Sequence, residues 1–260
     1  MIKETLTSKE KERYTRHLII DEIGEEGQLK IKQASVLVVG TGGLGSPIAY
    51  YLAAAGVGKL GIVDCDTVSL SNLNRQILHQ TADLDRPKVN SAYEKLMALN
   101  PNVEIVRYNV KVKRDNIAEI ISGYDIVVDG TDNFITRFII NDACVAAKKP
   151  YVFGAVKKFM GQVTFILPGE GPCFRCLFPD APEDDLDWGS KKPIGVLGAV
   201  PGVIGSLEAT EALKYILGVG ENLVGRLLIY DGLNMEFREI IVEANPDCPT
   251  CGHWDDFTEN

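Results

Sequence analysis

The sequence predicts an α/β protein with a doubly wound, mostly parallel sheet and antiparallel later strands. In the first half of the chain, short apolar runs alternate with helical segments, which is the order of a parallel sheet with right-handed crossovers. These runs are residues 35–39, 60–63, 103–106 and 124–128. The later strand-like runs are residues 151–153, 161–167, 227–230 and 239–242. Residues 161–167 alternate between apolar and polar side chains, as a half-exposed strand does. A length of 260 residues suits one large domain of this class.

The composition excludes several classes of protein. An apolar content of 45% supports a substantial core, and a net charge of −9 argues against nucleic-acid binding. The first residues lack the apolar core of an export signal, so we expect a cytoplasmic protein. Residues 35–58 carry no charge and are long enough to suggest a membrane span. Their central glycines and Pro47 argue against one, and we expect no membrane contact.

The first part of the chain, residues 8–33, is polar and has helical spacing. We expect Gly24 to divide it into two helices. Arg16 lies on the first of them, and composition alone favours an ordinary solvent-exposed charge there. Neither His17 nor His79 has an identifiable partner in the sequence.

A glycine-rich turn follows the first apolar run. Residues 40–45 read GTGGLG and fit G-x-G-x-x-G, and an Ala-rich helix over residues 48–55 comes next. Such a turn lets the backbone approach phosphate groups, and the helix N-terminus adds free N–H donors. The next strand, residues 60–63, ends in Asp64 and Asp66. The pattern alone fits a nicotinamide or flavin enzyme as well as an ATP enzyme.

Charged residues at other strand ends favour ATP. Arg75 closes a polar segment after the second strand, Lys88 precedes the helix over 89–99, and Asp132 follows the strand over 124–128. Ligands of such sheets bind beyond the carboxyl ends of the strands. Carboxylates there suit a ribose and Mg²⁺, and the two cations suit phosphates. A nicotinamide site needs no metal.

Four of the six cysteines form two C-x-x-C pairs, far apart in the sequence, namely Cys173, Cys176, Cys248 and Cys251. Two such pairs, brought together by the fold, can hold one tetrahedral Zn²⁺. A redox pair or four unlinked thiols are the alternatives, and the turn residues around both pairs favour a structural zinc. His253 could substitute for a ligand. Cys65 and Cys144 have apolar neighbours, and we predict them to be core residues.

Taken together, these motifs resemble those of the ubiquitin-activating-enzyme-like (ThiF/MoeB/HesA) family of ATP-dependent sulfur-carrier adenylyltransferases. The motifs are GTGGLG, DCDTVSLSNLNRQ, RPKV, DGTDN and the two C-x-x-C pairs. The resemblance implies a homodimeric, Rossmann-like fold with a zinc site. It implies adenylylation of the C-terminal glycine of a small ubiquitin-like sulfur carrier ending in Gly-Gly, in molybdopterin or thiamine biosynthesis, with release of pyrophosphate. A fused or separate sulfurtransferase could act next.

The resemblance also assigns roles to residues. Asp64 would bind the ribose, Asp132 would hold Mg²⁺, and Arg75 and Lys88 would contact the phosphates. Arg16 would reach into the partner subunit's site as an arginine finger. This role replaces the ordinary solvent-exposed charge that composition alone favours. Arg16, Arg75, Lys88 and Asp132 are thus the predicted catalytic residues. The predicted nucleotide-binding residues are Gly42, Gly43, Asp64, Asp66, Ser71, Asn72, Leu73, Asn74, Arg75, Lys88, Asp132 and Asn133.

These roles divide the single domain 1–260 into three parts. Residues 1–33 form N-terminal helices, 34–150 the nucleotide-binding part and 151–260 the carrier-binding and zinc part. One departure from the family concerns its covalent cysteine, because residues 177–247 contain none. We therefore expect the reaction to stop at the acyl-adenylate, with the acidic loop over 179–193 lying over the carrier's tail.

Two other function classes are weighed against this one. A Rossmann NAD(P)- or FAD-dependent oxidoreductase would use the same glycine turn for a dinucleotide. A catalytically silent scaffold of the same fold is the other alternative, and the intact Arg75, Lys88 and Asp132 argue against it.

Overall fold

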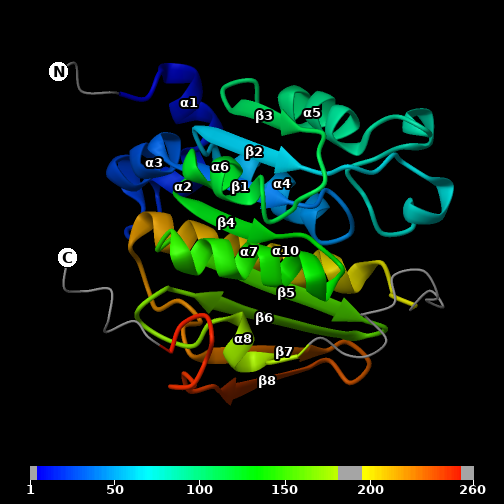
Figure 1. Ribbon diagram of the computed structural model, residues 1–260. Coiled ribbons are helices and arrows are strands. Elements are labelled where there is room, and N and C mark those ends of the chain that lie inside the picture. The colour runs from blue at the N-terminus through cyan, green and yellow to red at the C-terminus, as the bar shows by residue number, and fades with distance from the viewer. Residues whose placement is uncertain (1–4, 181–194, 253–260) are drawn as a thin grey trace.

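A computed structural model describes residues 5–180 and 195–252 (Figure 1). Its centre is an eight-stranded sheet in the order β3-β2-β1-β4-β5-β6-β7-β8. Helices cover both faces, and Figure 1 shows α7 (Phe134–Ala146) in front of the sheet and α10 (Ala199–Leu217) behind it. The predicted mixed α/β sheet is confirmed.

The first five strands pair in parallel. They are β1 (Ser35–Val39), β2 (Lys59–Val63), β3 (Glu104–Tyr108), β4 (Ile126–Asp129) and β5 (Tyr151–Lys157). β1 and β4 are buried over nearly their whole length, as expected for strands covered on both faces. β1 has β2 on one side and β4 on the other. The carboxyl ends of these three strands therefore meet where the strand order reverses.

Three antiparallel strands complete the sheet, namely β6 (Met160–Ile166), β7 (Arg226–Asp231) and β8 (Glu236–Ile241). Every residue of the edge strand β8 is exposed. The antiparallel later strands are thus confirmed, and among the described residues no strand pairs with the outer edge of β8.

The predicted helices are present, and the short η1, η2 and α8 are additional ones that were not predicted. Three short helices precede the sheet instead of two, and α7 was not predicted. Gly24 begins the last of those three, at the expected break. The remaining helices are α1 (Ser8–Arg13), α2 (Thr15–Leu18), α3 (Gly24–Gln33), α4 (Gly45–Ala55), η1 (Leu70–Asn72), η2 (Thr81–Asp83), α5 (Lys88–Leu99), α6 (Ile117–Ser122) and α8 (Phe174–Leu177).

The core lies in two clusters, one on each face of the sheet. One packs α4, α5 and α10 against the sheet, and the other packs α6 and α7 against the opposite face. Cys144 is in the second cluster, as predicted for a core residue. No helix among the described residues is long and apolar enough to cross a membrane.

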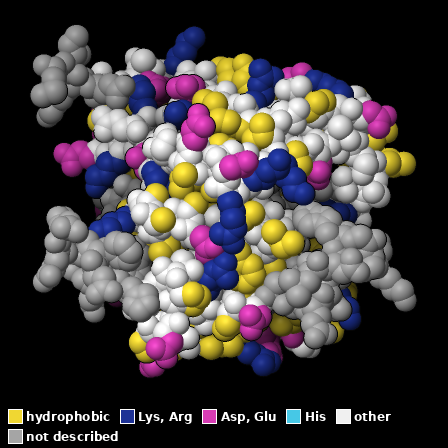
Figure 2. All heavy atoms as spheres, viewed as in Figure 1, with side chains coloured by type: hydrophobic (Ala, Val, Ile, Leu, Met, Phe, Trp, Pro, Cys, Tyr) yellow, Lys and Arg dark blue, Asp and Glu magenta, His cyan; other side chains and the backbone are white. Residues whose placement is uncertain are grey.

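Acidic and basic side chains are interspersed over the face drawn in Figure 2, with apolar side chains between them. Nearly all of the predicted loop over 179–193, and also His253, fall outside the described residues.

Candidate active site and metal centre

Backbone contacts shape the glycine-rich turn after β1. Gly40 has φ of +90°, and a Cβ on it would lie 2.6 Å from the Gly130 carbonyl oxygen in the turn after β4. A Cβ on Gly45, the first residue of α4, would lie 1.9 Å from the Gly40 carbonyl oxygen. Only glycine fits these close approaches. No side chain caps α4, but the Ser46 and Ile48 N–H groups already donate to the Gly42 and Leu44 carbonyl oxygens, and Pro47 has no N–H. Binding of an anion here would therefore fall to the N–H groups of the glycine-rich turn itself.

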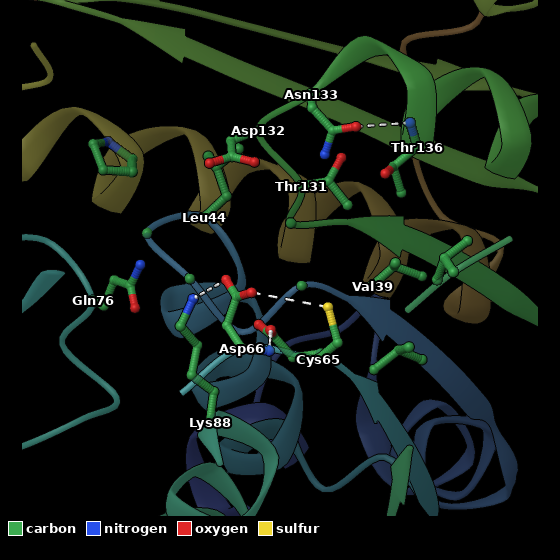
Figure 3. Close-up of a pocket in the computed structure, with 18 of the residues that line it drawn as sticks. Val39, Leu44, Cys65, Asp66, Gln76, Lys88, Thr131, Asp132, Asn133 and Thr136 are labelled. Atoms are coloured by element: carbon green, nitrogen blue, oxygen red, sulfur yellow. Dashed lines mark hydrogen bonds and ion pairs between the residues drawn. The ribbon is translucent and has the colours of Figure 1, made fainter. Parts of the chain in front are cut away.

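A cavity of about 650 Å³ opens over this turn (Figure 3). This is within the usual size range of small-molecule sites. It gathers side chains from the turns after β1, β2 and β4, together with Lys88 at the start of α5. The predicted site residues that line it are Gly42, Gly43, Asp64, Asp66, Arg75, Lys88, Asp132 and Asn133.

Two carboxylates follow β2, and each has defined partners. The backbone N–H and the hydroxyl of Thr41 both donate to Asp64 Oδ2, at 2.8 and 2.9 Å. The Asp66 N–H donates to Asp64 Oδ1 at 2.9 Å. The Asp66 carboxylate pairs with the Lys88 ammonium at 2.8 Å (Figure 3). Asp64 is thereby fixed against the glycine turn, and Lys88 is held at the cavity wall.

Arg75 is positioned by the polar segment before it. Its Nη1 donates to the Ser71 carbonyl oxygen at 3.2 Å and to Asn74 Oδ1 at 3.1 Å. Ser71, Asn72, Leu73 and Asn74 are not among the residues that line the cavity. Ser71 and Asn74 orient Arg75 through the two hydrogen bonds above. Asn72 stabilises the segment itself, because its Oδ1 accepts a hydrogen bond from the Ser69 hydroxyl at 2.9 Å.

The turn after β4 supplies Asp132 and Asn133. Asn133 caps α7, because its Oδ1 accepts the Thr136 N–H at 2.9 Å (Figure 3). The Asp132 side chain is exposed at the cavity. An exposed carboxylate at such a cavity is a suitable ligand for Mg²⁺.

Gln76, Thr131 and Arg137, which were given no role in the sequence analysis, also line the cavity. Gln76 Oε1 and the Thr131 hydroxyl are buried without a hydrogen-bond partner in the described structure, and the buried Arg137 Nε has an ion-pair partner but no hydrogen bond. Buried polar atoms are nearly always paired in folded proteins. Their gathering around one cavity therefore marks a ligand site.

Beneath the cavity lies a buried charged network. Arg137 Nε is 3.5 Å from Asp129 Oδ2, which also accepts the Tyr151 hydroxyl at 2.7 Å. Burial raises the pKa of Asp129, and the nearby Arg137 opposes that shift. Burial also raises the pKa of Glu208 well above its usual range.

His79 has partners that the sequence did not reveal. Its Nε2 lies 2.9 Å from the Thr41 carbonyl oxygen and its Nδ1 lies 2.9 Å from the Ser91 hydroxyl. Burial lowers the pKa of His79, so the neutral ring donates to Thr41 and accepts from Ser91. The ring thereby connects the glycine turn to α5. His17 likewise has a partner, since its Nδ1 lies 2.9 Å from Gln28 Oε1.

The prediction for Cys65 was wrong. This residue is exposed and lines the cavity, because the chain turns outward directly after β2. Partial burial of the sulfur and the carboxylates of Asp66 and Asp64 raise the pKa of its thiol. The thiol is accessible, but it is a poor nucleophile at neutral pH.

Arg16 lies on α2 with its side chain exposed, and it is not among the residues that line the cavity. Within the part of one chain that the structure describes, the cavity is formed without it.

The four cysteines of the C-x-x-C pairs do meet. Their sulfurs all lie within 4.8 Å of one another. Cys173 and Cys248 are 3.6 Å apart, and Cys176 and Cys251 are 3.4 Å apart. A tetrahedral zinc with bonds of about 2.3 Å needs sulfurs roughly 3.8 Å apart. A hydrogen bond from Cys251 lowers the pKa of the Cys173 thiol to about 5. These four side chains therefore fit a zinc ion.

Side chains of α7 hold the cysteine-bearing segment in place. Arg175 forms a two-pronged ion pair with Asp142, at 2.7 and 2.9 Å. Asn141 Oδ1 accepts the Phe174 N–H at 2.8 Å. Such surrounding contacts orient metal ligands. The predicted Cys₄ cluster is thus formed and supported, as a structural site requires.

Comparison with known protein families matches the ThiF family model over residues 14–250. The chain belongs to the ThiF family. A sulfur carrier protein adenylyltransferase of Thermus thermophilus is 49% identical over 95% of this chain and 92% of its own length. A SAMP-activating enzyme E1 of Haloferax volcanii is 47% identical over 95% of this chain and 91% of its own length.

Some relatives are longer. An adenylyltransferase and sulfurtransferase of Zea mays, MOCS3-1, is 48% identical, and this chain spans 53% of it. Among solved structures, E. coli MccB matches with a TM-score of 0.83 at 22% identity, over 95% of this chain and 76% of that one. At this identity, the match shows a shared fold.

Membership of the ThiF family confirms the resemblance found in the sequence. The enzyme class is confirmed as well, since these named relatives of the family are adenylyltransferases.

Proposed function

We propose that this enzyme adenylylates the C-terminal glycine carboxylate of a small ubiquitin-like sulfur-carrier protein, using ATP and releasing pyrophosphate. One observation carries the proposal. A glycine turn for phosphate, three carboxylates and four cationic side chains, Arg75 and Lys88 among them, line a single cavity at the carboxyl edge of the sheet. The names of the relatives support both the adenylyl transfer and the carrier substrate.

The cavity's side chains match the parts of ATP. Asp64, fixed by Thr41, would accept hydrogen bonds from the ribose hydroxyls, and the glycine turn would bind phosphate through N–H groups. Asp132 would hold Mg²⁺, which would neutralise charge on the phosphates. Arg75 and Lys88 would place positive charge beside the same phosphates.

Lys88 has a specific part in this scheme. Its side chain is 7% exposed, and its ammonium pairs with Asp66, whose side chain is 64% exposed. A triphosphate entering the cavity gives Lys88 a stronger anionic partner without moving its helix. The charge is therefore positioned in advance of the reaction, which is the most effective use of an electrostatic group.

The chemistry then needs little more than positioning. The carrier's terminal carboxylate attacks the α-phosphorus, a new P–O bond forms, and the bond to the β-phosphate oxygen breaks. A carboxylate is already ionised at neutral pH, so no general base is required. The enzyme contributes alignment of the two substrates and stabilisation of charge.

The open edge of the sheet suits a protein substrate. Apolar side chains stand exposed on and beside β8, among them Phe237, Ile240 and Ile241. An unpaired edge strand with such side chains is a surface on which another protein can dock. We assign this edge, within residues 151–260, to the carrier.

The finer parts of the proposal follow the family resemblance. They are a cytoplasmic homodimer, a single domain over 1–260, Arg16 acting in the partner's site, a structural zinc and a sulfurtransferase that receives the adenylate. The pathway is that of molybdopterin or thiamine. The relative from Zea mays carries a sulfurtransferase in its name, and this chain spans about half of it.

Carrier-dependent exchange of pyrophosphate into ATP tests the proposed reaction. Each candidate Gly-Gly-ended protein is added to the pure enzyme with ATP, Mg²⁺ and labelled pyrophosphate. Exchange that requires an intact carrier C-terminus is the expected result. Binding of NAD(H) without binding of ATP would instead support the oxidoreductase alternative.

A further inference from the structure

Gln76 is a buried side chain in the cavity whose amide is not used by the fold. It is 5% exposed and lines the cavity, and its Oε1 has no hydrogen-bond partner among the described residues. Gln28 is a useful contrast. Its Nε2 donates to the Ala55 carbonyl oxygen at 2.8 Å, and its Oε1 lies 2.9 Å from His17 Nδ1.

The backbone around Gln76 is anchored to the glycine turn at two points. The Leu78 N–H donates to the Ser46 hydroxyl at 3.3 Å, and that hydroxyl donates to the Gly42 carbonyl oxygen at 2.6 Å. The two segments therefore keep a fixed separation, and Gln76 belongs to the same rigid unit as the glycine turn.

His79 provides the second anchor. Its N–H donates to the Gln76 carbonyl oxygen at 3.0 Å, which closes a tight turn, and its ring contacts the Thr41 carbonyl oxygen at 2.9 Å. A side chain supported in this way is pre-organised for a ligand.

The amide nitrogen of Gln76 lies beside the glycine turn. A Cβ built on Gly42 would be 3.4 Å from Gln76 Nε2, and Figure 3 shows this nitrogen pointing toward the turn. The neighbouring side chain, Arg75, already brings a cation to the cavity. An amide next to it adds two N–H donors of fixed direction and no charge.

We infer that the Gln76 amide binds a phosphate group of the bound nucleotide, with Nε2–H donating to a phosphate oxygen held at the glycine turn. This inference rests on the proposed function and adds a ligand to the predicted set.

The test is nucleotide binding by two variants of the full-length protein. Gln76→Met keeps the length of the side chain and removes the donors, whereas Gln76→Glu places an anion beside the phosphates. ATP·Mg²⁺ affinity is measured by calorimetry, and adenosine affinity by displacement of a fluorescent ATP analogue. We expect Gln76→Met to weaken ATP binding about tenfold or more, as for a lost hydrogen bond to a charged group. Gln76→Glu should weaken it further, and neither should change adenosine binding.

Thermal unfolding without nucleotide supplies the control. Gln76→Met should unfold at the wild-type temperature or above, since no hydrogen bond to the protein is lost. The matched variant Gln28→Met loses two hydrogen bonds and should unfold at a lower temperature with ATP affinity unchanged. Unchanged ATP binding by both Gln76 variants would overturn the inference about Gln76 but leave the proposed function standing. So would a loss of adenosine affinity equal to the loss of ATP affinity. A wild-type protein that binds no ATP·Mg²⁺ would overturn the proposed function as well.

Discussion

The Lys88 ammonium lies 2.8 Å from the Asp66 carboxylate and is nearly buried, whereas Asp66 is largely exposed. A buried cation beside this cavity has more effect on a bound anion than a solvated cation has, because solvent screens it less. This asymmetry makes Lys88 the member of the pair on which the chemistry should depend.

We expect Lys88→Met to lower kcat/KM of carrier-dependent pyrophosphate exchange about a hundredfold or more, since it removes a positioned charge from the transition state. Lys95→Met is the matched control. Lys95 lies on the same helix and pairs with Asp83 outside the cavity, so its loss should reduce stability but not exchange. Similar exchange by both variants would remove Lys88 from the site.

Asp132→Ala should abolish adenylylation and leave the fold intact, because this exposed side chain contributes little to packing. Loss of a Mg²⁺ ligand removes charge neutralisation at the phosphates. Asp115→Ala, another exposed aspartate, serves as the control. Near-normal exchange by a folded Asp132→Ala protein would contradict the assignment.

One zinc per chain is expected in protein purified without chelators, bound by the four clustered cysteines. All four positions of a tetrahedral ion would be filled, so its role is structural. Chelation should lower the unfolding temperature by about 10 °C or more, since metal binding contributes directly to folding free energy. Elemental analysis and calorimetry measure both quantities. As chelator removes the zinc, the unfolding temperature should fall before the rate of pyrophosphate exchange does.

Arg16 should act across a dimer interface. Arg16→Ala and Lys88→Ala proteins should each be inactive, and mixing them should restore part of the activity, since one site of each heterodimer is then intact. An arginine supplied to phosphates from a partner can contribute about a thousandfold in rate. Absence of rescue despite demonstrated subunit exchange would favour a site built within one chain.

The enzyme should form no thioester with its carrier. Cys65 is accessible in the cavity, yet its raised pKa leaves little thiolate at neutral pH. Incubation with carrier and ATP·Mg²⁺ should give no thiol-sensitive adduct on a non-reducing gel. N-ethylmaleimide should label Cys65 faster as pH rises toward its elevated pKa, and ATP should slow the labelling. An adduct that disappears in Cys65→Ala would show that this thiol does accept the acyl group.

Much of the fold was predictable because the local sequence patterns indicate the same elements that the tertiary structure contains. The apolar strands, the glycine turn and the acidic strand ends each carry their own signal, and parallel topology brings those ends together. The cysteine pairs were predictable because few structures other than metal sites require two C-x-x-C turns.

Other features depend on contacts between distant segments. The partners of His79 on the glycine turn and α5 have no local signature, nor does the orphaned amide of Gln76. The apolar strand before Cys65 suggested a buried thiol, but the residue lies between Asp64 and Asp66, and the end of its strand turns it toward solvent. Asn133 gave a usable signal for the missed helix α7, since asparagine is a favoured N-cap.

The mutual contact of Gly40 and Gly130 means that the base of the nucleotide cavity is main chain against main chain. Its contour is set by the covalent geometry of the polypeptide, and no choice of side chain can adjust it. Altered preference for a nucleotide must therefore arise from side chains elsewhere on the cavity wall. A library aimed at changing the preferred nucleotide should vary wall residues that are not assigned to phosphate or Mg²⁺ and leave both glycines untouched.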